Sequence, residues 1–523
     1  MLHPSHLSHP ETIDIIAAIS PQFTAMKKPL FLLLLVLFCG SIQLGAQDGK
    51  TALDAASAAL GAASLRSIEF SGRGFDYIFG QPYDASSPWP RFAVPAMTVS
   101  IDYTTPAIRD DRRRQQYENP PLGGGFQPLA GELRQIWLMS GNYAWEMTGT
   151  TAIPSAPERD FRSAVDGRMT QIWATPQGFI KQAIASAATA RTETIRGAKK
   201  TIVTFTAPNK MKFEGVLSDQ NLVERIVTWY GSPVLGDTKF EADFSDYKDF
   251  GGVRFPTHIV QRNGPYPILD LTVTDVKPNA TVSIDVPANI RNASPAVPAP
   301  VQAEKISDGI WMVQGGAKSL ALDMKDHIVV IEAPETEARS IAVIDAVKKA
   351  IPGKPIKYLI NTHHHYDHSG GLRTYAAEGA TIITHYTNIP FYENIWRNPR
   401  TISPDRLAKS GRTPVFEGIT GSRILSDGAR EIDIYHYGGN MHNPGLLMIY
   451  LPRERMLIEA DSWTPPAPGD VPGAVVNLVN FYEAVQRLNL DVEQVVPIHG
   501  RLTTFDEIRQ AVQTYGKTQY WTN

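Results

Sequence analysis

One histidine-rich segment carries the clearest chemistry in this chain. Four histidines and an aspartate fall within six positions: His363, His364, His365, Asp367 and His368. The apolar run Tyr358–Ile360 precedes them and predicts a buried strand that ends at the segment. His363 and His365 are two positions apart, so an extended backbone places both on one side. Because imidazole and carboxylate groups are ordinary zinc ligands, the segment predicts a metal site.

Two metal ions would need more ligands than this segment offers, because catalytic zinc usually takes three protein ligands and one water. Candidates of the right type lie beside later apolar strands, where side chains can converge. His442 lies in a turn-rich loop before Leu446–Leu451, Asp461 follows Met456–Ile458, and His499 ends Val495–Ile498. A carboxylate such as that of Asp461 can bridge two cations. The predicted metal-binding residues are His363, His365, Asp367, His368, His442, Asp461 and His499.

Other candidates have a structural interpretation beside the functional one. His364 alternates with the predicted ligands and should point away, either behind the site or into solvent. His385, His436 and His258 lack motif context and are expected to be ordinary strand or surface residues. Glu332 ends an apolar strand, and both a hydrogen-bonding role behind the metal site and a purely structural role stay open.

The elements around these residues predict an α/β architecture from about Glu304 onward. Short apolar strands alternate there with helical patterns, which is typical of layered α/β folds. Apolar residues at helical spacing predict a helix over Glu337–Ile351. Thr504, with Glu507 three positions later, predicts the start of the last helix as a capping box.

The preceding half predicts an antiparallel β-sheet. Met97–Tyr103 alternates apolar and polar residues, and Ile136–Met147 has the pattern of a hairpin. A helix is expected over Thr51–Leu65, which is rich in Ala and Leu. The run Arg112–Arg114 is expected to be a solvated loop.

Residues 1–46 are expected to be an upstream extension and a secretory signal. Met26-Lys27-Lys28 precedes the apolar run Leu30–Leu37, which is too short for a membrane span, and small residues follow it. A lipid anchor on Cys39, the one cysteine of the chain, is the alternative. The protein is therefore predicted to be exported, periplasmic or extracellular, with no transmembrane span in its mature form.

Composition gives the remaining domain boundaries and excludes some classes of function. Residues 47–291 form the expected β-rich domain, 292–303 a Pro/Ala linker, and 304–523 the domain with the predicted metal site.

With 43% hydrophobic and 20% charged residues, the chain is expected to fold. A net charge of −3 gives no basic footprint for nucleic acid, so we expect no nucleic-acid partner. The partner that we expect is a small-molecule substrate. The oligomeric state stays open.

The segment His363 to His368 resembles the H-x-H-x-D-H pattern of the metallo-β-lactamase fold superfamily. His442, Asp461 and His499 follow in that family's order, and the resemblance covers roughly residues 304–505. It implies an αββα sandwich with the metal ions at one edge. His363, His365 and His442 would hold the first ion, Asp367, His368 and His499 the second, and Asp461 would bridge them.

The resemblance also implies a mechanism. Two ions, expected to be zinc with iron or manganese as alternatives, would generate a metal-bound hydroxide that attacks an ester, thioester, lactone or amide. Asp367 would orient this nucleophile as the catalytic residue. Asp461 stands where many β-lactamases of the fold carry Cys, which makes β-lactamase activity the less favoured alternative.

Two other classes of function stay open. Persulfide dioxygenases resemble this fold and use one iron, held mainly by the first set of ligands. Alternatively, the β-rich half is a ligand-binding module, loosely similar to periplasmic lipoprotein carriers, and the metal site is vestigial. Metal analysis distinguishes the dioxygenase from the hydrolase. An apolar ligand that co-purifies with the protein would support the ligand-binding module.

Overall fold

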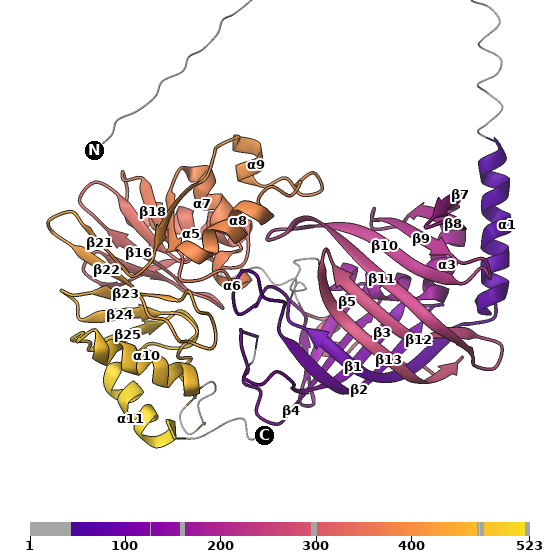
Figure 1. The fold of residues 1–523 in the computed structure, drawn as a ribbon, viewed down its shortest axis with the longest axis horizontal. Helices are drawn as coiled ribbons and strands as arrows, with labels where there is room; N and C mark the ends of the chain where they lie inside the picture. The colour runs from indigo at the N-terminus through magenta and orange to yellow at the C-terminus, as the bar shows by residue number, and fades with distance from the viewer. Residues whose placement is uncertain are drawn as a thin grey trace, which may run out of the picture.

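The computed structural model describes residues 43–125, 127–156, 163–293, 301–467, 470 and 475–517. Within these ranges the chain forms two parts, a large sheet part and a layered sandwich (Figure 1). The signal run, Cys39 and linker residues 294–300 lie outside the described residues, so those expectations stay predictions. None of the described helices has the length and apolarity that a membrane crossing requires.

The first part is built on an antiparallel sheet, as the alternating pattern predicted. Among the described residues it has 13 strands. In spatial order they are β6 (Thr151–Pro154), β5 (Tyr143–Thr148), β4 (Glu132–Ser140), β3 (Ala107–Gln116), β2 (Arg91–Asp102), β1 (Ser67–Tyr77), β13 (Tyr266–Pro278), β12 (Arg254–Asn263), β11 (Gly236–Asp249), β10 (Val223–Ser232), β9 (Lys212–Leu217), β8 (Ala198–Thr206) and β7 (Thr189–Ile195). The predicted hairpin is β4–β5.

Helices cover one face of this sheet and close its hydrophobic core. They are α1 (Gln43–Leu60), α2 (Ala164–Trp173) and α3 (Pro176–Ala185), with the short α4 (Ala288–Arg291) near β5 and β6. The expected helix over Thr51–Leu65 is present, but it begins earlier and ends at Leu60. Gly61 ends it, because its φ of 64° is left-handed and cannot continue a helix.

The expectation of a solvated loop at Arg112–Arg114 was wrong. These residues lie inside β3, and Arg114 is buried. Arg114 Nε donates to Asp76 Oδ2 at 2.5 Å, and Arg112 pairs with both Asp76 and Asp110. Because the buried Asp76 lies 36 positions or more away in sequence, the local charge run gave no sign of this pairing.

The second part contains two sheets with helices outside. The first sheet has β14 (Ala303–Ser307), β15 (Ile310–Val313), β16 (Ser319–Asp323), β17 (Ile328–Ile331), β18 (Ile356–Ile360), β19 (Thr381–His385) and β20 (Val415–Ile419). The second has β21 (Ser422–Ser426), β22 (Glu431–His436), β23 (Leu447–Leu451), β24 (Met456–Glu459), β25 (Gln494–Pro497) and β26 (Thr503–Thr504). The helices are α5 (Glu337–Ala350), α6 (Tyr366–Ser369), α7 (Leu372–Glu378), η1 (Tyr386–Asn388), α8 (Ile389–Ile395), α9 (Arg406–Ser410), α10 (Val475–Arg487) and α11 (Phe505–Tyr515).

Three hydrophobic layers stack through this part and give the expected αββα order. One layer, including Leu320, Ile360 and Ile458, lies between the two sheets. A second packs α5 and α7 on the outer face of the first sheet, and a third packs α10 and α11 on the second. The predicted helix at Glu337 is α5, and the last helix begins after Thr504, whose hydroxyl accepts from Glu507 N–H.

Parallel pairing brings strand ends to one edge of the sandwich. β17 pairs with β18 and β18 with β19, all in parallel, while β24 and β25 are parallel in the other sheet. The carboxyl ends of parallel strands meet at the same edge, so the residues that follow them lie close together. Glu332, His363, Asp461 and His499 all follow such strands.

The two parts share a packed interface beside this edge. Phe79 and Trp89 of the β1–β2 loop, with Val234 and Leu235 of the β10–β11 turn, join the hydrophobic layer of α5 and α7. Figure 1 shows the indigo loops of the sheet part facing α6 of the sandwich. The site at the strand ends therefore lies next to the sheet part.

Candidate metal centre

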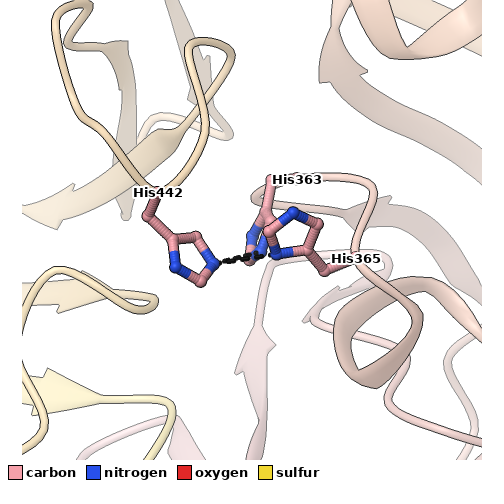
Figure 2. A group of neighbouring side chains, drawn as sticks. All are labelled: His363, His365 and His442. Carbon is pink, nitrogen blue, oxygen red and sulfur yellow. Dashed lines mark hydrogen bonds between the residues drawn. The ribbon is translucent and has the colours of Figure 1, made fainter. Parts of the chain in front are cut away.

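A first group of three imidazoles converges at the edge of the sandwich. His363 and His365 follow β18, and His442 lies in the loop before β23. His365 Nδ1 lies 2.8 Å from His442 Nε2, which in turn lies 3.3 Å from His363 Nε2 (Figure 2). All three side chains are buried. The three predicted first-site residues therefore meet at one point.

Asp461 and a second group extend this cluster. Asp461 Oδ2 lies 2.6 Å from His368 Nε2 and 3.3 Å from His363 Nε2, and its Oδ1 lies 3.5 Å from His499 Nε2. Asp367 Oδ2 lies 3.5 Å from His499 Nε2. Asp367, His368 and His499 form one candidate ligand group, and Asp461 lies between it and the first. All seven predicted residues are brought together.

Hydrogen-bond acceptors behind the rings fix which nitrogen faces the centre. His363 Nδ1 lies 3.0 Å from Thr362 Oγ1, and His365 Nε2–H donates to the Pro82 carbonyl at 2.7 Å. His368 Nδ1–H donates to Glu332, and His499 Nδ1–H donates to the Gly316 carbonyl at 2.8 Å. Each ring thereby presents its other nitrogen to the cluster, as metal-binding histidines do.

This donor set fits a bound cation. The pKa of His365 is held well below its usual range, so the ring is neutral, and its hydrogen is committed to Pro82. Its Nδ1 lone pair then faces His442 Nε2 at 2.8 Å. Two lone pairs at that separation repel unless a proton or a metal ion lies between them. Neutral imidazole nitrogens with carboxylates opposite them are the set that binds zinc.

The electrostatics differ between the two groups. Burial and the neighbouring imidazoles hold the pKa of His363 well below its usual range. Burial also acts to lower the pKa of His368, but the carboxylates of Asp461, Glu332 and Asp367 outweigh it and hold that pKa well above. Burial likewise opposes the rise at His499, whose pKa is raised to about 9 by Asp461 and Asp367. The second group therefore stabilises positive charge.

Backbone conformation near the centre is unusual at two strand ends. Glu332 and Asp461 follow β17 and β24 with φ of 68° and 62°, a left-handed conformation that side-chain-bearing residues rarely adopt. Such strain persists only where surrounding contacts enforce it, and it gathers at functional sites. Gly370 and Gly371 allow close backbone approach beside the cluster, since an added Cβ would lie 1.9 Å from Glu335 O and from Ser340 Oγ respectively.

The structure also locates the residues whose roles the sequence left open. Glu332 supports the cluster, because it accepts from both His368 and the Thr362 N–H, the latter at 2.7 Å. His364 is buried behind the site rather than exposed, 3.0 Å from Asn443 Nδ2. His385 and His436 end β19 and β22, and their rings lie 4.1 Å apart between centroids. His258 lies in β12, as expected, and contacts Asp270.

Three contributors had no signal in the sequence. Gln81 Nε2 donates to Asp367 Oδ1 at 2.7 Å, and the Pro82 and Gly316 carbonyls accept from His365 and His499. Gln81 and Pro82 belong to the sheet part, more than 280 positions from their partners. Any residue type can supply a backbone carbonyl acceptor, and a single glutamine forms no recognisable sequence motif, so these groups could not be predicted from the sequence.

A family model and a curated relative each match a part of this chain. Residues 325–496 match the family model of the metallo-beta-lactamase superfamily. The 2,4-dinitroanisole O-demethylase subunit alpha of Nocardioides sp. (strain JS1661) is 25% identical over 201 residues, 38% of this chain and 56% of that protein. The match thus spans little more than half of that relative.

Solved structures are similar to about two fifths of this chain at low identity. A metallo-beta-lactamase from Pontibacter korlensis is 20% identical with a TM-score of 0.33, covering 42% of this chain and 100% of that one. The rubredoxin oxygen:oxidoreductase of Desulfovibrio gigas is 16% identical with a TM-score of 0.33, covering 41% and 60%. From the family model and the layered fold, the C-terminal half of this chain contains a metallo-beta-lactamase superfamily domain, preceded by a large antiparallel sheet.

Proposed function

We propose that this domain is a metal-dependent hydrolase of esters, thioesters, lactones or amides that holds two ions, with zinc the expected metal. The observation that carries the proposal is the position of Asp461, between two complete groups of three ligands. A single carboxylate that faces both groups suits a pair of cations. We further propose that the protein is exported, periplasmic or extracellular, and acts on a small molecule.

When bound, the ions would supply Lewis acidity, which polarises a carbonyl and makes water acidic near neutral pH. The chain's own residues supply the rest. His363, His365 and His442 would hold the first ion, with Asp367, His368 and His499 around the second and Asp461 shared. Asp367 has one oxygen fixed by Gln81, and its Oδ2, which lies 3.5 Å from His499 Nε2, would orient a water molecule beside the second ion and accept its proton.

The alternatives differ in metal content and substrate. A mononuclear-iron enzyme similar to persulfide dioxygenases would use mainly the first group, and the complete second group disfavours it. β-Lactamase activity is disfavoured because Asp461 stands where many such enzymes carry Cys. The name of the Nocardioides relative records O-demethylation of 2,4-dinitroanisole, so an aryl methyl ether belongs in any substrate survey.

Asp367→Ala tests the proposal on a panel of esters, thioesters, lactones, β-lactams and an aryl methyl ether. We expect wild type to hydrolyse at least one acyl substrate, and the variant to lose about 10²- to 10⁴-fold in kcat, because the residue that orients water and takes its proton is gone. The matched control is Asp345→Ala, an exposed position on α5. Equal activity of wild type and Asp367→Ala on every substrate would contradict the proposal.

A further inference from the structure

The loop between β1 and β2 reaches across the domain interface to the candidate metal centre. Gly80 O accepts from the Tyr366 N–H at 3.2 Å, at the first residue of the turn that carries Asp367. The Phe79 ring packs edge-on to Tyr366, with centroids 5.6 Å apart. The backbone of the sheet part is therefore fixed against the segment that bears the predicted ligands.

Gln81 is directed from this loop at one carboxylate of the cluster. Its side chain is 5% exposed, and its Nε2 donates to Asp367 Oδ1 at 2.7 Å. The other oxygen, Oδ2, is the one nearer to His499 and His368, at 3.5 and 3.8 Å. Gln81 therefore sets the rotation of the Asp367 carboxylate and leaves one oxygen facing the second group.

The next residue acts on the first group. The Pro82 carbonyl accepts the hydrogen of His365 Nε2 at 2.7 Å, which leaves the Nδ1 lone pair directed at the point shared with His442 and His363. Two adjacent residues of the sheet part thus orient one predicted ligand in each group.

A glycine loop from the same part holds this arrangement together. Gly123 N–H donates to Met441 O at 2.9 Å, and Gly124 N–H donates to Gln81 O at 3.1 Å. A Cβ on Gly124 would lie 1.9 Å from Gln81 Oε1 and 2.8 Å from His442 Cε1. The backbone of this loop fits between Gln81 and His442 only because position 124 has no side chain.

We propose that the sheet part completes the metal centre, with Gln81 and the Pro82 carbonyl as positioning groups and Gly124 as the close-packing residue beside them. The inference rests on the proposed function in that it takes the cluster to bind metal. It assigns the N-terminal sheet a role in the site itself. This differs from the alternative in which the sheet is an independent ligand-binding module and the metal site is vestigial.

The first test uses Gln81→Leu in the full-length protein, because Leu keeps much of the volume and removes the amide. The matched control is Gln220→Leu, at an exposed turn of the same part. We expect Gln81→Leu to release zinc to a chromogenic chelator about 10- to 100-fold faster than wild type, because loss of such a supporting hydrogen bond typically lowers metal affinity by about that factor. Release equal to that of Gln220→Leu would overturn the role of Gln81.

Cobalt substitution gives a readout that general destabilisation would not produce. The visible absorption of bound Co²⁺ reports ligand geometry, so Gln81→Leu should shift the spectrum while Gln220→Leu leaves it unchanged. Gly124→Ala should shift it too, because the new Cβ displaces Gln81 or His442. Gly421→Ala is the control, since a Cβ there meets nothing within 4 Å. Wild-type spectra for both Gln81→Leu and Gly124→Ala would overturn the inference.

The outcomes separate this inference from the proposed hydrolysis. If wild type binds metal but hydrolyses no substrate of the panel, the hydrolase proposal fails, while release rates and cobalt spectra still decide the role of the sheet part. If wild type hydrolyses a substrate, and both Gln81→Leu and Gly124→Ala keep the metal and the spectrum of wild type, the inference fails and the hydrolase proposal stands. If wild type binds no metal, both fail.

Discussion

At the scale of single residues, Glu332 joins two elements of the candidate centre. Its Oε1 accepts the Thr362 N–H at 2.7 Å, and its Oε2 accepts from His368 Nδ1. The side chain is fully buried and its backbone is left-handed. One carboxylate therefore fixes both the end of β18 and the ring that lies closest to Asp461.

Glu332→Gln should weaken metal binding while it keeps the shape of the side chain. A glutamine has one acceptor oxygen, so either Thr362 N–H or His368 Nδ1–H would face an NH₂ group. We expect metal affinity to fall about 10- to 100-fold, measured by equilibrium dialysis and metal analysis. Glu483→Gln, exposed on α10, is the control. Wild-type affinity in Glu332→Gln would show that this hydrogen bond does not support the centre.

Lys318 is a second single residue that shapes the centre, through the backbone. Its buried ammonium donates to the Pro497 carbonyl at 3.0 Å and also to Gly500 O. These carbonyls lie on both sides of His499. The charge on this lysine therefore holds the chain in the turn that presents His499 to Asp367 and Asp461.

At the scale of elements, turn contacts keep the two sheets of the sandwich in register. Asp427 follows β21, and its carboxylate accepts the Lys325 N–H at 2.5 Å and the Ala429 and Arg430 N–H groups at 2.8 Å. Lys325 lies just before β17. Burial opposes ionisation, but these backbone donors outweigh it and lower the pKa of Asp427 to about 2.

This shift predicts a pH dependence of stability. A carboxyl whose pKa is lower in the folded state stabilises the fold above its unfolded pKa and loses that effect as pH falls through the folded value. The stability gap between wild type and Asp427→Asn should therefore be full near neutral pH and shrink as pH falls from about 4 toward about 2. Urea midpoints across this window measure it. A gap that does not change with pH would contradict the role of the charge.

At the scale of the whole molecule, the two parts are joined by buried polar contacts as well as by packing. Arg400 is 8% exposed, and its guanidinium donates to the Ser232, Pro233 and Val234 carbonyls at 2.9 to 3.1 Å. Asp237 accepts from the Thr401 and Ile402 N–H groups nearby. The segment between η1 and β20 thus binds the sheet part.

Arg400→Met should weaken the interface and lower the stability of the whole protein. The substitution keeps the apolar stem but leaves three carbonyls without their donor, at a cost of about 1 to 3 kcal/mol. Urea unfolding measures this, and limited proteolysis should show faster cleavage. Arg412→Met, at an exposed position after α9, is the control. If both variants unfold alike, Arg400 is not an anchor of the interface.

The sequence by itself determined the seven residues of the candidate centre and the layered fold that holds them. Their types are those of metal ligands, and each follows or precedes an apolar strand, so local pattern was enough to expect convergence at a sheet edge. The alternating strands of the first half were likewise visible, because a sheet with one covered face has a period of two. The residue at which α1 begins and the burial of arginine in β3 could not be predicted from the sequence.

Only the tertiary structure decided that the sheet part belongs to the centre. Gln81 lies 286 positions from Asp367, and Pro82 lies 283 from His365. Such contacts depend on how the surfaces of the two parts pack against each other, which no local periodicity encodes. Any residue can supply a backbone carbonyl as a hydrogen-bond acceptor. The need for glycine at position 124 is apparent only once the side chains packed against it are placed. The clustered residues of the candidate centre were therefore predictable from residue type and spacing, whereas their supporting groups depended on the packing of one part against the other.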